Sequence, residues 1–275
     1  MKKILLFLLL IYPVLNTTAQ TYEEMVNRAM DYVDQNDYPA AEQAMKAALR
    51  KEPTNPNNPM LMVNLGTIQR NLGNLDEALI SYNVAIENYP DAIFIRHNRA
   101  ALYCEMNRFD DALKDYNTIL LAEPKDLEAL YRRALIYVTN KDYFTAEDDF
   151  EKILETYPEH LNAKMGIAAI KKRRLEWKEA EEMYSDLIYK HRTNPNAALY
   201  YNRAECYLRM NKLSSTDTDI KKALELGYDD ASIYILRGQL RLAQYEKRLA
   251  KEDFVKAKEL GAEESIVEEF LRLCK

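Results

Sequence analysis

Four arginines that recur at equivalent places along this sequence are each followed, sixteen residues later, by an aspartate. A guanidinium and a carboxylate that meet side by side form a two-pronged, hydrogen-bonded ion pair. The constant spacing therefore predicts four such pairs. The alternative is that these arginines bind an anionic ligand, but each brings its own counter-ion, which favours the pair. The four predicted pairs are Arg99 with Asp115, Arg133 with Asp149, Arg203 with Asp219 and Arg237 with Asp253.

A second concentration of positive charge is the run KKRR, at residues 171–174. In one interpretation, Lys172 and Arg173 reach a binding groove and hold an anion or a carboxylate there. In the other, the four cations only stabilise the C-terminal end of a helix, where positive charge is favourable by a few tenths of a kcal/mol. The second interpretation is the simpler one, and the first stays open.

No group of residues predicts catalysis. The three histidines, His97, His160 and His191, are far apart and have no partner at a metal-ligand spacing. The sequence also contains no glycine-rich phosphate loop, nucleophile motif or paired-cysteine site. Its many carboxylates fit solvated helix faces. We therefore expect a protein that is not an enzyme and that uses no metal or cofactor.

The paired arginines and aspartates recur because the chain consists of repeated units. One reference position can be chosen in each repeated unit. A large apolar residue stands four residues after it, and another apolar residue stands seven residues after it. A small residue stands twelve residues before it. Spacings of three, four and seven are those of helix faces. Each unit therefore predicts two helices joined by a short polar turn. The reference positions, 34 to 37 residues apart, are Ala41, Ala78, Ala112, Ala146, Ala180, Thr216 and Ala250.

A helix–turn–helix unit of 34 residues with small, aromatic and alanine positions and a closing proline resembles the tetratricopeptide repeat. The resemblance implies an all-α fold, a right-handed α-solenoid in which each unit buries its apolar face against its neighbours. Residues 264–275 have one apolar face and predict the capping helix that such a solenoid needs. The seven predicted units are about 22–55, 59–92, 93–126, 127–160, 161–194, 197–230 and 231–263.

The repeat also gives the arginine pairs a place in the fold. In a helical hairpin, the seventh and twenty-third residues of a unit lie at the same height, one on each helix. Each predicted pair would therefore join the two helices of its own unit. The first unit breaks the pattern, because Arg28 has the arginine position but Ala44 stands in place of the aspartate.

The family resemblance further implies a concave groove lined by the first helix of each unit. In the family, an asparagine at the sixth position often binds the backbone of an extended peptide, since an amide both donates and accepts hydrogen bonds. The alternative is that the residues at these positions are ordinary exposed polar groups. The groove residues implied here are Asn64, His97, Asn98, Tyr131, Arg132, Lys172, Arg173, Tyr201 and Asn202.

The first nineteen residues have the composition of a secretory signal peptide. Two lysines precede a short apolar run, and small residues follow it, which places cleavage near Ala19 and Gln20. The alternative is an uncleaved anchor. The remaining chain has no apolar run of the roughly 20 residues that a membrane span needs. We expect export to the periplasm or cell surface of a Gram-negative bacterium.

The composition of the chain limits the classes of partner that the protein can bind. The 275 residues carry a net charge of −6, which gives no electrostatic basis for binding nucleic acid. The odd number of cysteines is not a disulfide framework, and Cys274 is expected to be an exposed thiol. We expect a scaffold or assembly factor that binds another protein or an extended peptide. Two alternatives stay open: a glycan- or peptidoglycan-binding module that uses Tyr131 and Tyr201, and the binding subunit of an enzyme complex.

Overall fold

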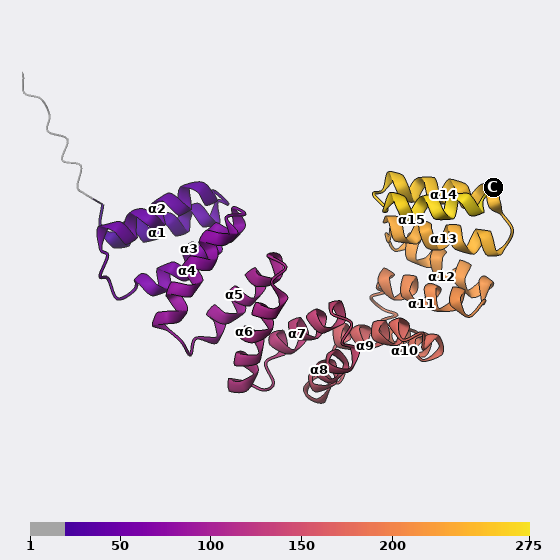
Figure 1. The fold of residues 1–275 in the computed structure, drawn as a ribbon, viewed down its shortest axis with the longest axis horizontal. Coiled ribbons are helices and arrows are strands. Elements are labelled where there is room, and N and C mark those ends of the chain that lie inside the picture. The colour runs from indigo at the N-terminus through magenta and orange to yellow at the C-terminus, as the bar shows by residue number, and fades with distance from the viewer. Residues whose placement is uncertain (1–19) are drawn as a thin grey trace, which may run out of the picture. The chain divides into compact units, whose positions relative to one another are not determined.

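The computed structural model of the chain describes residues 20–275 (Figure 1). The predicted signal peptide, residues 1–19, lies outside the described residues. The described part contains fifteen α-helices and no strand, which confirms the all-α prediction. The helices are α1 Tyr22–Asp34, α2 Tyr38–Lys51, α3 Asn58–Asn71, α4 Leu75–Asn88, α5 Ile93–Glu105, α6 Phe109–Ala122, α7 Leu127–Thr139, α8 Tyr143–Thr156, α9 Leu161–Arg173, α10 Trp177–Lys190, α11 Ala197–Arg209, α12 Leu213–Glu225, α13 Ala231–Ala243, α14 Lys247–Glu259 and α15 Glu264–Leu273.

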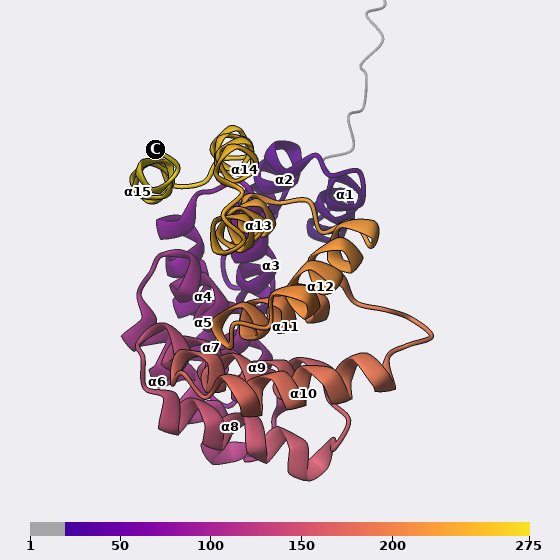
Figure 2. The same ribbon diagram turned by 90° about the vertical axis from the view of Figure 1, so that its right-hand side faces the viewer.

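The chain divides into two compact parts, one that ends at Asp115 and one that begins at Tyr116, within α6. In the first part, α1 packs on α2 and α3 packs on α4, and each pair packs on the next helix along the chain. In the second part the packed pairs are α7–α8, α9–α10, α11–α12 and α13–α14 (Figure 1, Figure 2). Helix pairs that pack in chain order are the arrangement predicted from the repeat.

The repeated apolar positions form the core of each unit. All seven reference residues, from Ala41 to Ala250, are fully buried. The small residue on the first helix is required by close packing: a Cβ atom on Gly66 would lie 2.8 Å from the ring of Tyr82, and one on Gly238 would lie 2.5 Å from the ring of Phe254. The small residue and the aromatic residue are therefore two halves of one contact between the helices of a unit.

Each turn between the first and second helix of a unit contains one residue with left-handed backbone, with φ between 56° and 79°. Asparagine and glycine adopt this conformation readily, whereas bulky residues do so at a cost. Leu175 and Tyr245 nevertheless occupy it, and their side chains are 68% and 92% exposed. The residues in this position are Asn36, Gly73, Asn107, Lys141, Leu175, Asn211 and Tyr245.

The last helix, α15, covers the end of the last repeat. Val267 is buried against α14, and the ring of Phe270 stacks on Phe254 with 4.9 Å between centroids. Cys274 was expected to be exposed, but it is half-buried, because it packs against the cluster of Ala250, Phe254 and Val267. Its sulfur donates to the carbonyl oxygen of Phe270 at 3.5 Å. Within residues 20–275, no helix has both the length and the apolar character needed to cross a bilayer.

Candidate functional site

The structure brings together all four predicted arginine–aspartate pairs. In the pair of Arg133 and Asp149, Nε donates to Oδ2 at 2.8 Å and Nη2 donates to Oδ1 at 2.6 Å. Arg99 holds Asp115 with the same geometry, at 2.8 and 2.6 Å. The hydrogen bonds from Arg133 to Asp149 raise the pKa of the guanidinium. In all four pairs the aspartate side chain is at most 4% exposed. These arginines are therefore used inside the fold and are not free to bind an anion.

The pairs also reach a third helix, which the sequence reasoning missed. Nη1 of Arg99 donates to Oδ1 of Asn83 at 2.8 Å, and Nη1 of Arg133 donates to Asn117 at 2.6 Å. Each asparagine belongs to the second helix of the preceding unit. One guanidinium thus links three helices and two consecutive units. The available signal was an asparagine sixteen residues before the arginine, which mirrors the aspartate sixteen residues after it.

Two predicted asparagines of the first part keep their side chains free. Asn64 on α3 and Asn98 on α5 are half-buried on adjacent helices. Within residues 20–275, neither side-chain amide forms a hydrogen bond. One turn before them lie Met60 and Phe94, which are 41% and 47% exposed. We call these four residues the α3–α5 face: two apolar side chains beside two free amides. His97 is half-buried on the same helix as Asn98.

In the second part, four of the predicted residues line one pocket of about 490 Å³ between α9, α10 and α11. We call it the α9–α11 pocket. Sequence reasoning missed half of its lining; two of these residues, Leu175 and Trp177, lie in the turn after α9 and at the start of α10, to which the repeat pattern assigns no binding role. The predicted members are Lys172, Arg173, Tyr201 and Asn202, and the others are Ala169, Leu175, Trp177 and Glu205.

Inside the pocket, Lys172 is already neutralised. Its Nζ donates to Oδ1 of Asn202 at 2.6 Å and forms an ion pair with Glu205. Asn202 in turn donates to the carbonyl oxygen of Ala198 at 2.7 Å. Both ends of the Asn202 amide are therefore occupied, unlike those of Asn64. A ligand would have to compete with these bonds to use Lys172 or Asn202.

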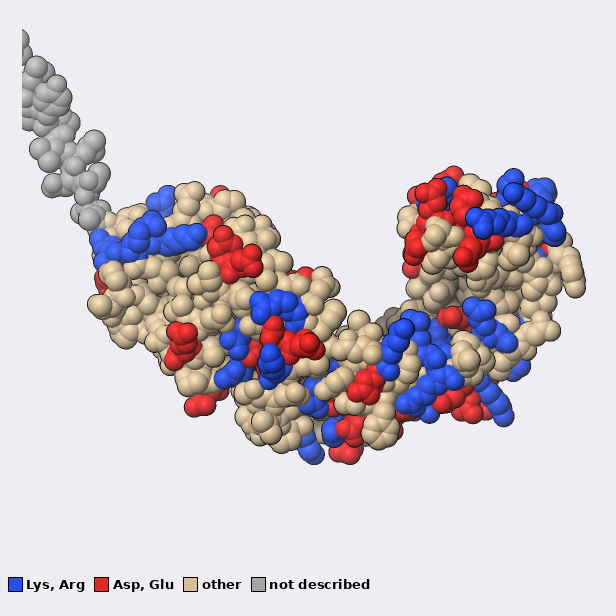
Figure 3. All heavy atoms as spheres, in the orientation of Figure 1, with Lys and Arg blue, Asp and Glu red and all other residues tan. Residues whose placement is uncertain are grey.

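The KKRR run is mostly paired as well. Lys171 lies 3.0 Å from Glu176, and Arg174 lies 2.5 Å from Glu147. Arg173 is the exception: it is exposed, and among the described residues it has no ion-pair partner. In the space-filling view, basic side chains gather in the region of α9 and α10, with acidic ones beside them (Figure 3). Arg173 is thus the cation of the run that a ligand can reach without breaking an existing pair.

The predicted aromatic residues are partly covered. The ring of Tyr201 stacks on Tyr228 with 4.7 Å between centroids, and burial raises the pKa of Tyr201 to about 12. Tyr131, on α7, packs against Phe150 at 5.9 Å. Arg132 on the same helix is exposed beside Glu128, at 3.7 Å, and the structure does not place it in the pocket. No cluster of metal-ligating side chains occurs among residues 20–275.

The packed helix pairs follow one another along the chain at the regular spacing of the repeat. They therefore define an α-solenoid built of helical hairpins. The sequence pattern of the tetratricopeptide repeat matches residues 26–93 and 98–160. A solved tetratricopeptide repeat protein from Parabacteroides merdae is 42% identical, covers 93% of this chain and 99% of its own, and superposes with a TM-score of 0.78. The chain belongs to the tetratricopeptide repeat family.

More distant similarities show the fold alone. The PilF protein of Pseudomonas aeruginosa is 15% identical and covers 78% of this chain and 97% of its own, with a TM-score of 0.63. RNA polymerase II-associated protein 3 of Xenopus laevis is 40% identical over 67 residues, which is 24% of this chain and 10% of that protein. The chain thus spans about a tenth of the length of the curated relatives it matches.

Proposed function

We propose that this protein is a non-catalytic scaffold that binds a segment of another protein, with the α9–α11 pocket as a principal contact. This proposal rests mainly on the lining of that pocket, where the unpaired Arg173 lies beside the apolar side chains of Leu175 and Trp177. A guanidinium binds a carboxylate, and an adjacent apolar wall binds an aliphatic or aromatic side chain. The pocket therefore fits a segment that presents a carboxylate next to an apolar residue.

The α3–α5 face supports the same function in the first part of the chain. A free amide can donate to a peptide carbonyl and accept from a peptide N–H, so Asn64 and Asn98 can bind a backbone irrespective of its sequence. The exposed rings and chains of Met60 and Phe94 supply apolar contact beside each amide. This face does not depend on the α9–α11 pocket, and each can be tested separately.

The test uses the single tryptophan of the chain, Trp177, which lines the pocket and so reports its occupancy by fluorescence. A photo-reactive residue at position 173 should cross-link a defined protein from envelope extracts. The matched control is the same residue at position 125, because Lys125 is exposed and has no ion-pair partner among the described residues. The purified partner should then change the Trp177 fluorescence, and Arg173→Glu should weaken that response about tenfold or more. Equal cross-linking at both positions would contradict the proposal.

The α3–α5 face has its own comparison. Asn98→Ala should reduce partner binding, whereas Asn71→Ala, on the exposed end of α3, should not. If a saccharide, and no protein, is lost from the pocket variants, the protein is a glycan-binding module instead. The stacking of Tyr201 on Tyr228 argues against that alternative, since one face of the ring is already covered. An enzyme found among the cross-linked proteins would make this chain its binding subunit.

We also propose export to the periplasm or cell surface of a Gram-negative bacterium, on the charge and hydropathy pattern of residues 1–19. Cell fractionation should recover the protein outside the cytoplasm, and N-terminal sequencing should find a chain that starts near Gln20. An intact N-terminus in the cytoplasmic fraction would contradict this.

A further inference from the structure

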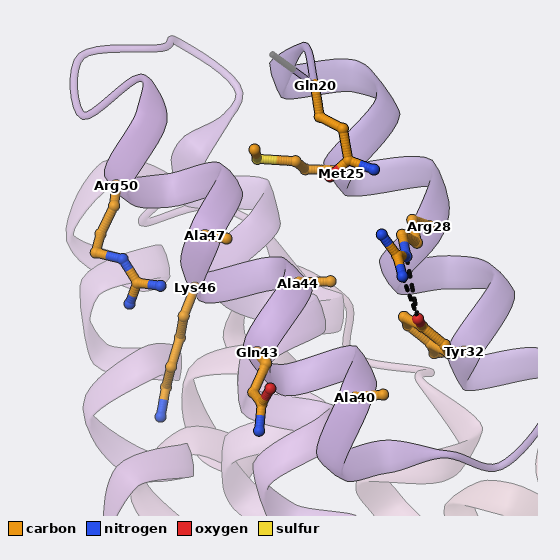
Figure 4. Close-up of a pocket in the computed structure, with 10 residues that line it drawn as sticks. All are labelled: Gln20, Met25, Arg28, Tyr32, Ala40, Gln43, Ala44, Lys46, Ala47 and Arg50. Atoms are coloured by element: carbon orange, nitrogen blue, oxygen red, sulfur yellow. Dashed lines mark hydrogen bonds between the residues drawn. The ribbon is translucent and has the colours of Figure 1, made fainter. Parts of the chain in front are cut away.

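The first repeat has a hollow of about 560 Å³ between α1 and α2 (Figure 4). We call it the front hollow. Its apolar floor consists of Met25 and three alanines of α2, and its lining includes three cations and no carboxylate. The lining residues are Gln20, Met25, Arg28, Tyr32, Ala40, Gln43, Ala44, Lys46, Ala47 and Arg50. Cations above a floor of small apolar residues fit a helix that carries a carboxylate among apolar side chains.

Arg28 lacks the partners that its equivalents have. In four later units, the arginine at this position holds an aspartate of its own unit, and Arg99 also holds Asn83 of the preceding unit. In the first unit, Ala44 replaces the aspartate, and Arg28 donates only to the hydroxyl of Tyr32, at 2.8 Å from Nη2 (Figure 4). Among the described residues, Arg28 therefore has no carboxylate partner.

The charges around Arg28 leave the hollow positive. Lys46 is paired with Glu42 at 2.6 Å. Arg50 is exposed and has no ion-pair partner within residues 20–275. Two guanidiniums, from Arg28 and Arg50, are therefore available to an incoming acidic group.

The other end of the same chain carries the complementary pattern. On α15, Ile266 and Leu273 are 42% and 59% exposed, and Glu269 lies one turn from each on the same helix face. We call these three residues the tail stripe. The neighbouring carboxylates of α15 already have a partner, since Glu264 and Glu268 both form ion pairs with Lys258. Glu269 is exposed and has no partner within the described residues.

We propose that the front hollow of one copy receives the tail stripe of a second copy, so that the protein associates head to tail. Glu269 meets the guanidinium of Arg28, and Ile266 and Leu273 lie on the alanine floor. The contact joins two different surfaces, so it is heterologous and extends into chains or rings rather than closing as a symmetric pair. We expect this association to be weak and to weaken further as salt is added, because few residues take part and ions screen the charges at the rim.

The test measures association of residues 20–275 by sedimentation velocity over a wide concentration range at low salt. Ala44→Asp restores to Arg28 the intramolecular partner that other units have, so it should preserve the fold and weaken association about tenfold or more. Arg28→Glu and Glu269→Lys should each weaken association similarly, and the double variant Arg28→Glu/Glu269→Lys should restore it. Lys125→Glu, an exposed charge reversal elsewhere, should change nothing. Circular dichroism verifies that every variant is folded.

A mixing experiment separates head-to-tail association from other arrangements. The Arg28→Glu chain keeps an intact tail, and the Glu269→Lys chain keeps an intact front hollow. Each should be monomeric alone, and an equimolar mixture should associate again, because the intact tail of one chain meets the intact hollow of the other and the two reversed charges also face each other. A front-to-front dimer would instead be lost with Arg28→Glu and unaffected by Glu269→Lys. That result, or a wild-type chain that stays monomeric at every concentration, would overturn the proposal.

Discussion

Arg133 and Asp149 lie on different helices, sixteen residues apart, and meet through two parallel hydrogen bonds of 2.8 and 2.6 Å. The carboxylate is fully buried, and the third nitrogen of the guanidinium extends to Asn117 of the preceding unit. Because the same geometry recurs at Arg99, the ion pair is an element of the repeat and not a local accident. It couples the two helices of a unit and couples that unit to its neighbour.

Arg133→Ala should lower the free energy of unfolding by about 3 kcal/mol, because it leaves the buried carboxylate of Asp149 without a counter-charge. Urea denaturation followed by circular dichroism measures the change. Replacing both partners by apolar residues, Arg133→Met with Asp149→Leu, should destabilise much less than the single change. Arg28→Ala is the matched control within the same repeat position, and it should change stability by about 0.5 kcal/mol or less, since Arg28 has no carboxylate partner.

If Arg133→Ala left the stability unchanged but abolished partner binding, the arginine would be a ligand-binding residue and the structural interpretation would be wrong. The double variant allows the measurement even if the single variant does not fold, because it buries two apolar side chains and no unpaired charge.

The pair of Arg70 and Glu105 predicts a pH dependence of stability in the first part of the chain. Nε and Nη2 of Arg70 donate to Glu105 at 2.9 and 2.5 Å, and these hydrogen bonds lower the pKa of the carboxyl group. A pKa lower in the folded state means that the stabilisation is present above the unfolded pKa and is lost as the pH falls through the folded value. Since the Glu105 side chain is 43% exposed, solvent screens the pair, and its contribution is about 1 kcal/mol or less.

The measurement for this pair is the difference in unfolding free energy between the wild type and Glu105→Gln. It should be positive near neutral pH and shrink towards zero in acid. Glu87→Gln, at an exposed carboxylate of α4, should show no such trend. A difference that stays constant across the acid range would mean that Glu105 acts through packing and not through its charge.

Tyr245 should be replaceable with a gain in stability. It holds a left-handed backbone at φ 64°, and its side chain is 92% exposed, so it gains little from packing in return. Asparagine tolerates this backbone better, so Tyr245→Asn should stabilise the protein by about 0.5 to 1 kcal/mol. The reverse change at the equivalent turn, Asn211→Tyr, should destabilise by a similar amount. Thermal unfolding of both variants measures this, and a loss of stability in Tyr245→Asn would show that the tyrosine makes an unrecognised contact.

The repeat made much of this structure predictable. Ala112 and its equivalents fix the helix register, and the register alone places Arg133 opposite Asp149. The binding residues were harder to assign, since exposure and pairing depend on neighbours that are distant in sequence. Nothing local to Asn202 indicates that Lys172, thirty residues earlier, occupies its side-chain oxygen, whereas Asn98 at the same repeat position remains free.

The lining of the α9–α11 pocket was also only partly predictable from the sequence. The family pattern directs attention to first helices, so it selects Tyr201 and omits Trp177, which begins a second helix. Leu175 enters the pocket because the turn before α10 carries a leucine in a left-handed position usually suited to asparagine or glycine. A residue that departs from the repeat's own preference was therefore a usable signal in the sequence.

Cys206 should be inert in the native protein. It is fully buried on α11, and burial raises the pKa of its thiol to about 12, so almost none of it is the reactive thiolate near neutral pH. In the variant Cys104→Ser/Cys274→Ser, where Cys206 is the remaining thiol, an alkylating reagent at mildly alkaline pH should label the folded protein far more slowly than the urea-unfolded one. The ratio of the two rates reports how often α11 opens. Rapid labelling of the folded variant would mean that α11 separates from α10 and α12 in solution, and the α9–α11 pocket would then form only part of the time.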